Sequence, residues 1–179
     1  MKSKNTLVVN LFGGPGAGKS TMAADLFAKL KVSGVECELV TEFAKDLVWR
    51  ESWKTFDDQL FVFANQHHRL KMVYGKVDVI VTDSPLICAI PYSRKEGGLF
   101  RQIVIERFDS FNNLNFFIER NVDHFSEIGR KHSLEESKMI DEEIKDLLEQ
   151  NDVRYLTVDN GLGKPIKRMY DLTIERITK

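Results

Sequence analysis

Cysteine and proline are both scarce in this 179-residue sequence, which contains two cysteines and four prolines. Cys37 and Cys88 stand far apart, and neither belongs to a Cys-x-x-Cys pair, which argues against a disulfide framework or a zinc ribbon. We interpret both as small buried hydrophobic residues in a reducing compartment. The sequence also has no internal repeat and no low-complexity linker, so we expect a single domain over residues 1–179.

Long apolar runs and an excess of one charge are absent as well. No apolar run approaches the about 20 residues that a membrane-spanning helix needs, and the basic N-terminus is not followed by a segment typical of a signal peptide. Lysine and arginine number 26 against 27 acidic residues, giving a formal net charge of -1. The chain therefore lacks a basic field that would attract duplex nucleic acid. We expect a cytoplasmic protein that binds neither membranes nor nucleic acids.

Short apolar runs alternate with longer amphipathic stretches along the chain. The apolar runs predict strands at residues 7–12, 35–41, 77–82, 114–118 and 153–158. The amphipathic stretches predict helices at residues 20–32, 43–50, 57–74, 98–110, 133–150 and 165–178. Ser133 and Glu136 have the spacing of a capping box at the start of one of these helices. The alternation predicts an α/β fold in which helices cover both faces of a parallel sheet.

The segment GGPGAGKS at residues 13–20 matches the phosphate-binding pattern G-x-x-x-x-G-K-[ST] between a predicted strand and a predicted helix. Glycines let successive backbone N–H groups point at an anion, and the helix N-terminus adds the positive end of its dipole. Lys19 supplies a positive charge for the β- and γ-phosphates, and the Ser20 hydroxyl is placed to bind Mg²⁺. The alternative is a chance glycine-rich turn, which the flanking strand and helix disfavour. The expected nucleotide-binding residues are Gly13, Gly14, Pro15, Gly16, Ala17, Gly18, Lys19, Ser20 and Thr21.

Two acidic residues follow predicted strands and should face the crevice at the carboxyl end of the sheet. Asp83 ends the third strand, and we assign it to Mg²⁺ through water; the alternative is a turn residue before Ser84-Pro85. Glu42 closes the second strand, where its carboxylate could orient a substrate hydroxyl or accept its proton. Equally, Glu42 could be a surface residue at the start of the next helix.

A polar segment at about residues 120–133 separates the fourth strand from the capped helix. Arg120 stands at its beginning and Arg130 near its end. The forked guanidinium group matches phosphate oxygens, so this segment could act as a lid that closes over a triphosphate and excludes water. The alternative interpretation is an ordinary solvated loop.

The helix predicted at residues 57–74 could border a pocket for the phosphate acceptor. We expect Leu60, Phe61, Phe63 and Ala64 to share its buried face. Gln66 or Arg69 could read a base or a ribose. The aromatic side chains of Trp49, Trp53 and Phe56 could stack on a base, although packing at the core or its rim is the simpler interpretation.

With these motifs in place, the chain resembles the P-loop kinase superfamily, and within it the small NadR-like ATPase/kinase proteins. Many of these are encoded by bacteriophages and are related to the nicotinamide riboside kinase domain. The resemblance runs through most of the chain. Its segments are GGPGAGKST, TEFAKDL, VDVIVTDSPL, ERNVDHFSEIGRKHSLEESKMIDEEI and NDVRYLTVD. For a phage-encoded member, the expected location is the host cytoplasm.

The resemblance implies a three-layer α/β/α fold whose five-stranded parallel sheet has the order 2-3-1-4-5. It implies ATP and Mg²⁺ as cofactors, with transfer of the γ-phosphate to a small acceptor. The roles that it implies are phosphoryl stabilisation by Lys19, Arg120 and Arg130, organisation of metal or substrate by Asp83, and a hydroxyl-facing carboxylate at Glu42. The turn after Asp83 departs from the Asp-Arg or Glu-Arg-Ser pattern of thymidylate and deoxynucleoside kinases, which argues against a plain deoxynucleoside acceptor.

Three functions remain open at this point. The first is a kinase that acts on a nucleoside, a nucleoside monophosphate or nicotinamide riboside. The second is an ATP-hydrolysing regulator without a small acceptor; a GTPase is disfavoured because the sequence has no Asn-Lys-x-Asp signature for guanine. The third is a polynucleotide 5′-end kinase, which would need a basic channel lined by aromatic residues and which the nearly neutral charge does not support.

Overall fold

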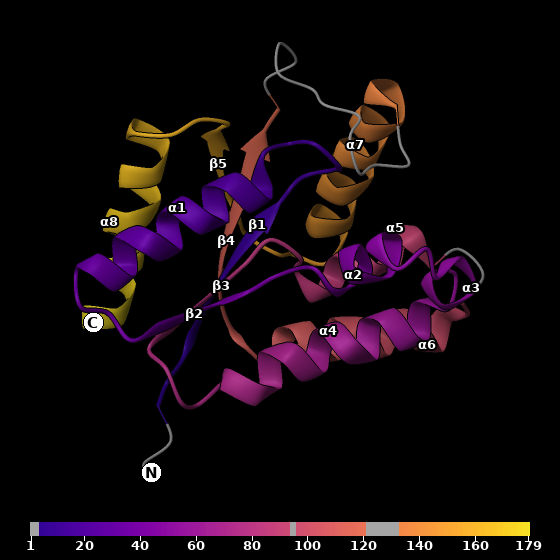
Figure 1. The fold of residues 1–179 in the computed structure, drawn as a ribbon, viewed down its shortest axis with the longest axis horizontal. Helices are drawn as coiled ribbons and strands as arrows, with labels where there is room; N and C mark the ends of the chain where they lie inside the picture. Colours follow the sequence, from indigo (N-terminus) through magenta and orange to yellow (C-terminus); the bar gives the residue numbers. More distant parts are fainter. Residues whose placement is uncertain (1–3, 94–95, 121–132) are drawn as a thin grey trace.

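Five parallel strands form a sheet at the centre of the molecule. A computed structural model describes residues 4–93, 96–120 and 133–179 of the chain (Figure 1). The strand order is β2-β3-β1-β4-β5 and each pairing is parallel, which confirms the order that the resemblance implied. The strands are β1 (Leu7–Phe12), β2 (Cys37–Val40), β3 (Val79–Thr82), β4 (Asn112–Glu119) and β5 (Leu156–Asp159).

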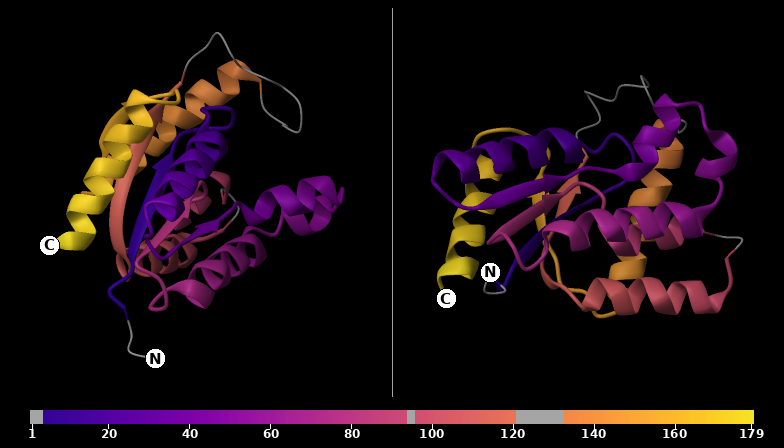
Figure 2. Two further views of the ribbon diagram at one scale, coloured as in Figure 1. Left: turned by 60° about the vertical axis from the view of Figure 1, so that its left-hand side comes forward. Right: turned by 60° about the horizontal axis from the view of Figure 1, so that its bottom comes forward.

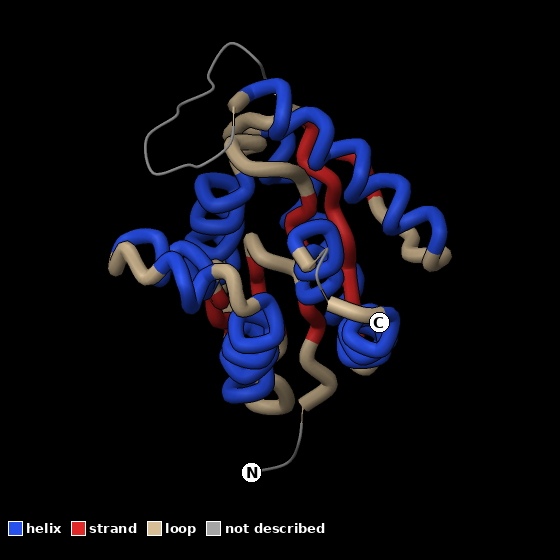
Figure 3. Tube along the Cα trace, turned by 90° about the vertical axis from the view of Figure 1, so that its right-hand side faces the viewer, coloured by secondary structure: helices blue, strands red, loops and turns tan. Residues whose placement is uncertain are grey.

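Helices pack on both faces of this sheet and give three layers (Figures 2 and 3). One face is covered by α1 (Lys19–Val32) and α8 (Lys164–Thr178), and the other by α4 (Gln59–Val73), α6 (Gly98–Asp109) and α7 (Leu134–Gln150). Shorter segments follow β2 and β3: α2 (Phe43–Trp49), α3 (Trp53–Phe56), the 3₁₀ turn η1 (Leu86–Cys88) and α5 (Ala89–Tyr92). The predicted three-layer α/β/α fold is confirmed. Within the described residues, no helix has the length and apolar character to cross a membrane.

Strand β1 is buried on both faces and supplies side chains to two hydrophobic cores. Leu7, Val9 and Leu11 pack with residues of α1 and α8. Val8 and Phe12 alternate with them and pack with residues of α4, α6 and α7. Because successive strand residues point to opposite faces, this apolar run fills both cores and holds the following loop at the carboxyl edge of the sheet.

The region between β2 and β3 differs from the prediction. The helix predicted at residues 57–74 is α4, which begins two residues later at Gln59, where the Asp58 side chain accepts from the Phe61 N–H at 3.0 Å; the short helix α3 was not predicted. Of the predicted buried face, Phe63 is buried, but Leu60 and Phe61 are 54% and 42% exposed. The buried residues of α4 are Gln59, Phe63, Gln66 and Leu70. Two glutamines therefore point inward, where sequence periodicity favoured apolar residues.

The predicted start of α7 is confirmed. The Ser133 side chain accepts a hydrogen bond from the Glu136 N–H at 3.2 Å, and the Glu136 carboxylate accepts one from the Ser133 N–H at 2.7 Å. This capping box satisfies backbone donors at the helix end that would otherwise lack partners.

Candidate active site

The loop at residues 13–20 joins β1 directly to α1. Gly13 and Gly18 have positive φ angles of 138° and 95°, a conformation that side chains with a Cβ resist. Gly18 is the N-cap of α1, and Lys19 is its first residue. The free N–H groups of the first helical turn therefore face the loop, and the helix dipole favours an anion there.

The Lys19 ammonium group is held against this loop. Its Nζ donates to the carbonyl oxygens of Gly13 at 2.7 Å and Gly14 at 2.9 Å. The same side chain lines a cavity together with Gly16, Gly18 and Ser20. The positive charge and the helix N-terminus thus lie on the same side of the loop, as phosphate binding requires.

A buried ion pair fixes the back of the loop. The Gly14 N–H donates to the Asp141 carboxylate, and the other Asp141 oxygen accepts from Arg120 Nε at 2.9 Å. Arg120 Nη1 also donates to the Pro15 carbonyl at 2.7 Å. The two side chains of the pair are only 5% and 10% exposed. The end of β4 and the middle of α7 are thereby connected to the loop.

The position of Arg120 differs from the one expected for a residue that contacts the transferring phosphate. The side chain lies behind the loop, in contact with Asp141 and Pro15, and Arg120 is not among the described residues that line the cavity. A direct role of Arg120 at the transferring phosphate stays a prediction. Arg130 and residues 121–132 of the expected lid lie outside the described residues.

We expect Asp141→Ala to lower the free energy of unfolding by about 3–5 kcal/mol, because it removes one member of a buried, hydrogen-bonded ion pair. Urea unfolding measures this change. The control is Lys167→Ala, which removes an exposed pair with Asp171 on α8 and should cost at most about 1 kcal/mol. If both variants lose the same small amount, the Arg120–Asp141 pair does not support the loop.

Gly14 is packed so closely that a methyl group does not fit. A Cβ there would lie 2.5 Å from the Ser137 carbonyl oxygen and 2.9 Å from an Asp141 oxygen. We expect Gly14→Ala to cost about 1–3 kcal/mol of stability and to abolish the rise in melting temperature produced by Mg-ATP. Gly97→Ala is the control, since nothing lies within 4 Å of a Cβ at that position. Equal melting temperatures for the two variants, with and without Mg-ATP, would contradict this prediction.

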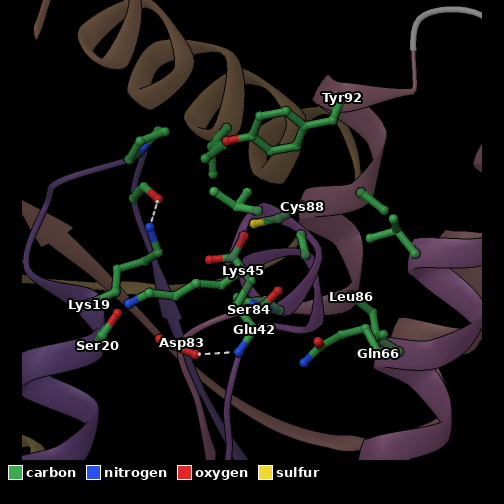
Figure 4. A pocket seen from close by; sticks show the side chains of 18 of the residues that line it. Lys19, Ser20, Glu42, Lys45, Gln66, Asp83, Ser84, Leu86, Cys88 and Tyr92 are labelled. Atoms are coloured by element: carbon green, nitrogen blue, oxygen red, sulfur yellow. Dashed lines mark hydrogen bonds between the residues drawn. The ribbon is translucent and has the colours of Figure 1, made fainter. Parts of the chain in front are cut away.

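Asp83 lies at the carboxyl end of β3, on the floor of the cavity. It is 5% exposed, and one of its oxygens accepts from the Glu42 N–H at 3.1 Å (Figure 4). Ser20 lines the same cavity. Mg²⁺ keeps several waters and usually takes one or two protein ligands beside substrate phosphates, so a hydroxyl and a carboxylate are a suitable set. No cluster of three or more carboxylates, histidines or cysteines suitable for a metal cage occurs in residues 4–93, 96–120 or 133–179.

Glu42 is half-buried and directs its carboxylate into the cavity (Figure 4). It is the N-cap residue of α2, yet its side chain makes no capping hydrogen bond. Burial raises the pKa of the Glu42 carboxyl, and the nearby Asp83 raises it further, while Lys19 and Lys45 act in the opposite direction. The structure thus places the Glu42 carboxyl group at the cavity, and its expected role at a substrate hydroxyl stays a prediction.

The cavity continues from the loop past Glu42 and has a volume of about 370 Å³. Gln66 borders it, whereas Arg69 forms an ion pair with Asp46 and donates to the Thr41 carbonyl. Of the aromatic candidates, Trp49 and Phe56 line the cavity. The apolar lining of the cavity includes Val48, Trp49, Phe56, Val62, Phe63 and Leu86. Its size and mixed lining suit a small organic molecule.

Two lining residues come from the short helical segments that the sequence did not predict. Cys88 belongs to η1 and Tyr92 to α5, and both side chains face the cavity (Figure 4). Burial raises the pKa of the Cys88 thiol to about 12, so it stays neutral at physiological pH. Segments of three and four residues are too short for a hydrophobic period to be recognised. Cys37 is fully buried, as predicted.

The fold and the loop define a P-loop NTPase with a kinase-like fold, a class of protein that binds nucleotides. A sequence model of the family described as "AAA domain" matches residues 8–163, and the chain belongs to this family. The structure is similar to that of thymidylate kinase from Ehrlichia chaffeensis, with a TM-score of 0.59 and 14% sequence identity over 98% of this chain and 100% of that one. No curated protein sequence matches the chain significantly.

Proposed function

We propose that the protein transfers the γ-phosphate of ATP to a hydroxyl group of a small acceptor. Candidate acceptors are a nucleoside, a nucleoside monophosphate and nicotinamide riboside. One observation carries the proposal: Lys19 of the P-loop, the half-buried Glu42 carboxylate and a set of apolar side chains line one continuous cavity. A protein that only hydrolyses ATP would need no compartment beyond the carboxylate.

The chemistry requires positioning more than covalent catalysis. The acceptor oxygen forms a bond to the γ-phosphorus while the bond from that phosphorus to the bridging oxygen breaks, which leaves ADP. The acceptor proton passes to Glu42, whose raised pKa makes it a stronger base than an exposed glutamate. Lys19 and the loop N–H groups stabilise the phosphate charge. Bound through Ser20 and Asp83, Mg²⁺ would supply further charge neutralisation.

Transfer of radiolabel from the γ-position of ATP tests the proposal. The purified protein is incubated with Mg²⁺ and a pool of nucleosides, nucleoside monophosphates, nicotinamide riboside and a 5′-hydroxyl oligonucleotide. A labelled small molecule, lost when Mg²⁺ is chelated, is the expected result. Labelled inorganic phosphate alone would favour the ATP-hydrolysing regulator, and a labelled oligonucleotide would favour a 5′-end kinase.

A further inference from the structure

Gln66 is held in one orientation by the backbone of α2. It projects from the buried face of α4 and is 5% exposed. Its Oε1 accepts a hydrogen bond from the Phe43 N–H at 2.8 Å. A carboxamide has one oxygen and one nitrogen, so a bond that fixes the oxygen also fixes the direction of the NH₂ group.

The Nε2 donor of Gln66 has no hydrogen-bond partner among the described residues. Buried side-chain donors are normally paired, because an unpaired one loses its hydration and gains nothing in return. Gln59, the other buried glutamine of α4, shows the usual outcome, since its Nε2 donates to the Phe56 carbonyl at 2.8 Å. The unpaired amide of Gln66 thus stands out against a matched residue two turns earlier on the same helix.

The surroundings indicate what Gln66 would contact. Gln66 borders the cavity on the side away from the P-loop, and Glu42 and Asp83 lie between them (Figure 4). The γ-phosphate is the terminal group of ATP, so a molecule beyond Glu42 is the acceptor and not the donor nucleotide. Phe63, Leu86 and Val62 provide apolar surface around the amide. Such walls suit a flat ring, and an N–H donor there suits a ring carbonyl or ring nitrogen.

We propose that Gln66 Nε2 donates a hydrogen bond to a carbonyl oxygen or a ring nitrogen on the heterocycle of the acceptor. This inference rests on the proposed function, and it assigns one side chain to the recognition of the ring that each candidate acceptor contains. It makes Gln66 a residue that determines specificity. A site built to hydrogen-bond a group discriminates strongly against analogues that lack it, because its buried donor is then left unpaired.

Three variants distinguish a loss of acceptor binding from a loss of the folded structure. Gln66→Glu keeps an oxygen for the Phe43 N–H and replaces the NH₂ donor with an acceptor. Gln66→Met removes both groups at similar volume. Gln102→Met makes the same change on the exposed side of α6 and serves as the control. Urea unfolding of all three variants shows whether the fold is retained.

Direct binding is measured by calorimetry at pH 8 with adenosine, guanosine, cytidine, uridine, their 5′-monophosphates, nicotinamide riboside and free ribose. We expect wild type and Gln102→Met to bind at least one base-containing compound more tightly than ribose. Both Gln66 variants should lose at least about tenfold of that affinity, with Mg-ATP affinity within twofold of wild type.

The inference is overturned if Gln66→Glu and Gln66→Met bind every compound as wild type does, or if ribose binds as well as the nucleosides. Failure of the proposed function gives a different result, in which no phosphate is transferred although a base-containing compound binds through Gln66. Conversely, if phosphate is transferred to an acceptor whose affinity does not depend on Gln66, the kinase proposal holds and the proposed role of Gln66 is overturned.

Discussion

Lys19→Ala is expected to lower phosphoryl transfer by at least about 10³-fold. The Lys19 ammonium group is already oriented by the Gly13 and Gly14 carbonyl oxygens, so little reorganisation is needed when phosphate arrives. Its charge would be applied inside a cavity, where electrostatic interactions are less screened than in water. Lys45 lines the same cavity, but Lys19 is the lysine whose ammonium group the Gly13 and Gly14 carbonyl oxygens hold against the loop.

The measurement is a comparison of kcat and of the Mg-ATP dissociation constant for wild type and Lys19→Ala. Lys29→Ala is the matched control, because Lys29 lies on the same helix at its opposite, exposed end. The control should retain wild-type kcat. If Lys19→Ala retained more than about a tenth of wild-type kcat with an unchanged melting temperature, the loop would not be the phosphate site.

The fold was largely predictable because its strands are short apolar runs between amphipathic helices. Leu7–Phe12 reads as a strand buried on both faces, and it is one. The order of the strands came from the resemblance, since hydrophobic periodicity carries no information about which strands pair. The inward-facing glutamines of α4 escaped prediction because their burial depends on partners outside the helix, such as the Phe43 N–H. Tertiary contacts of this kind override the local pattern.

The site residues that directly follow a strand could be predicted from the sequence. Asp83 and Glu42 were placed at the carboxyl edge of the sheet because parallel strands all end there, and the structure brings them into one cavity. Asp141 was missed. In the sequence it is one of several acidic residues on an amphipathic helix, and a solvent-facing position is the ordinary expectation for such a residue. Its contact with Gly14 joins residues 127 positions apart, which no local pattern reveals.

Glu42→Gln is expected to lower kcat by about 10²–10⁴-fold, because an amide cannot accept the acceptor proton. The pKa of Glu42 is raised by burial, so the acid limb of the wild-type pH–rate profile should lie above the ordinary glutamate pKa. The pH–rate profile of the residual activity of Glu42→Gln should lack this acid limb. Glu38→Gln is the control, because the Glu38 carboxylate lies on β2 and pairs with Lys31; this variant should keep both the wild-type rate and the acid limb.

Glu42→Gln should also stabilise the fold. A substitution that lowers activity but raises the free energy of unfolding is a specific expectation. A carboxyl whose pKa is higher in the folded state favours folding only while it is protonated, so ionised Glu42 opposes folding at neutral pH. Glu42→Gln should therefore unfold at a higher urea concentration than wild type at pH 8. The difference should shrink as the pH falls toward the unfolded pKa of about 4.3. A variant that loses both activity and stability at pH 8 would show that Glu42 supports the structure, whereas lower activity with higher stability identifies a carboxylate held in the cavity for its chemistry.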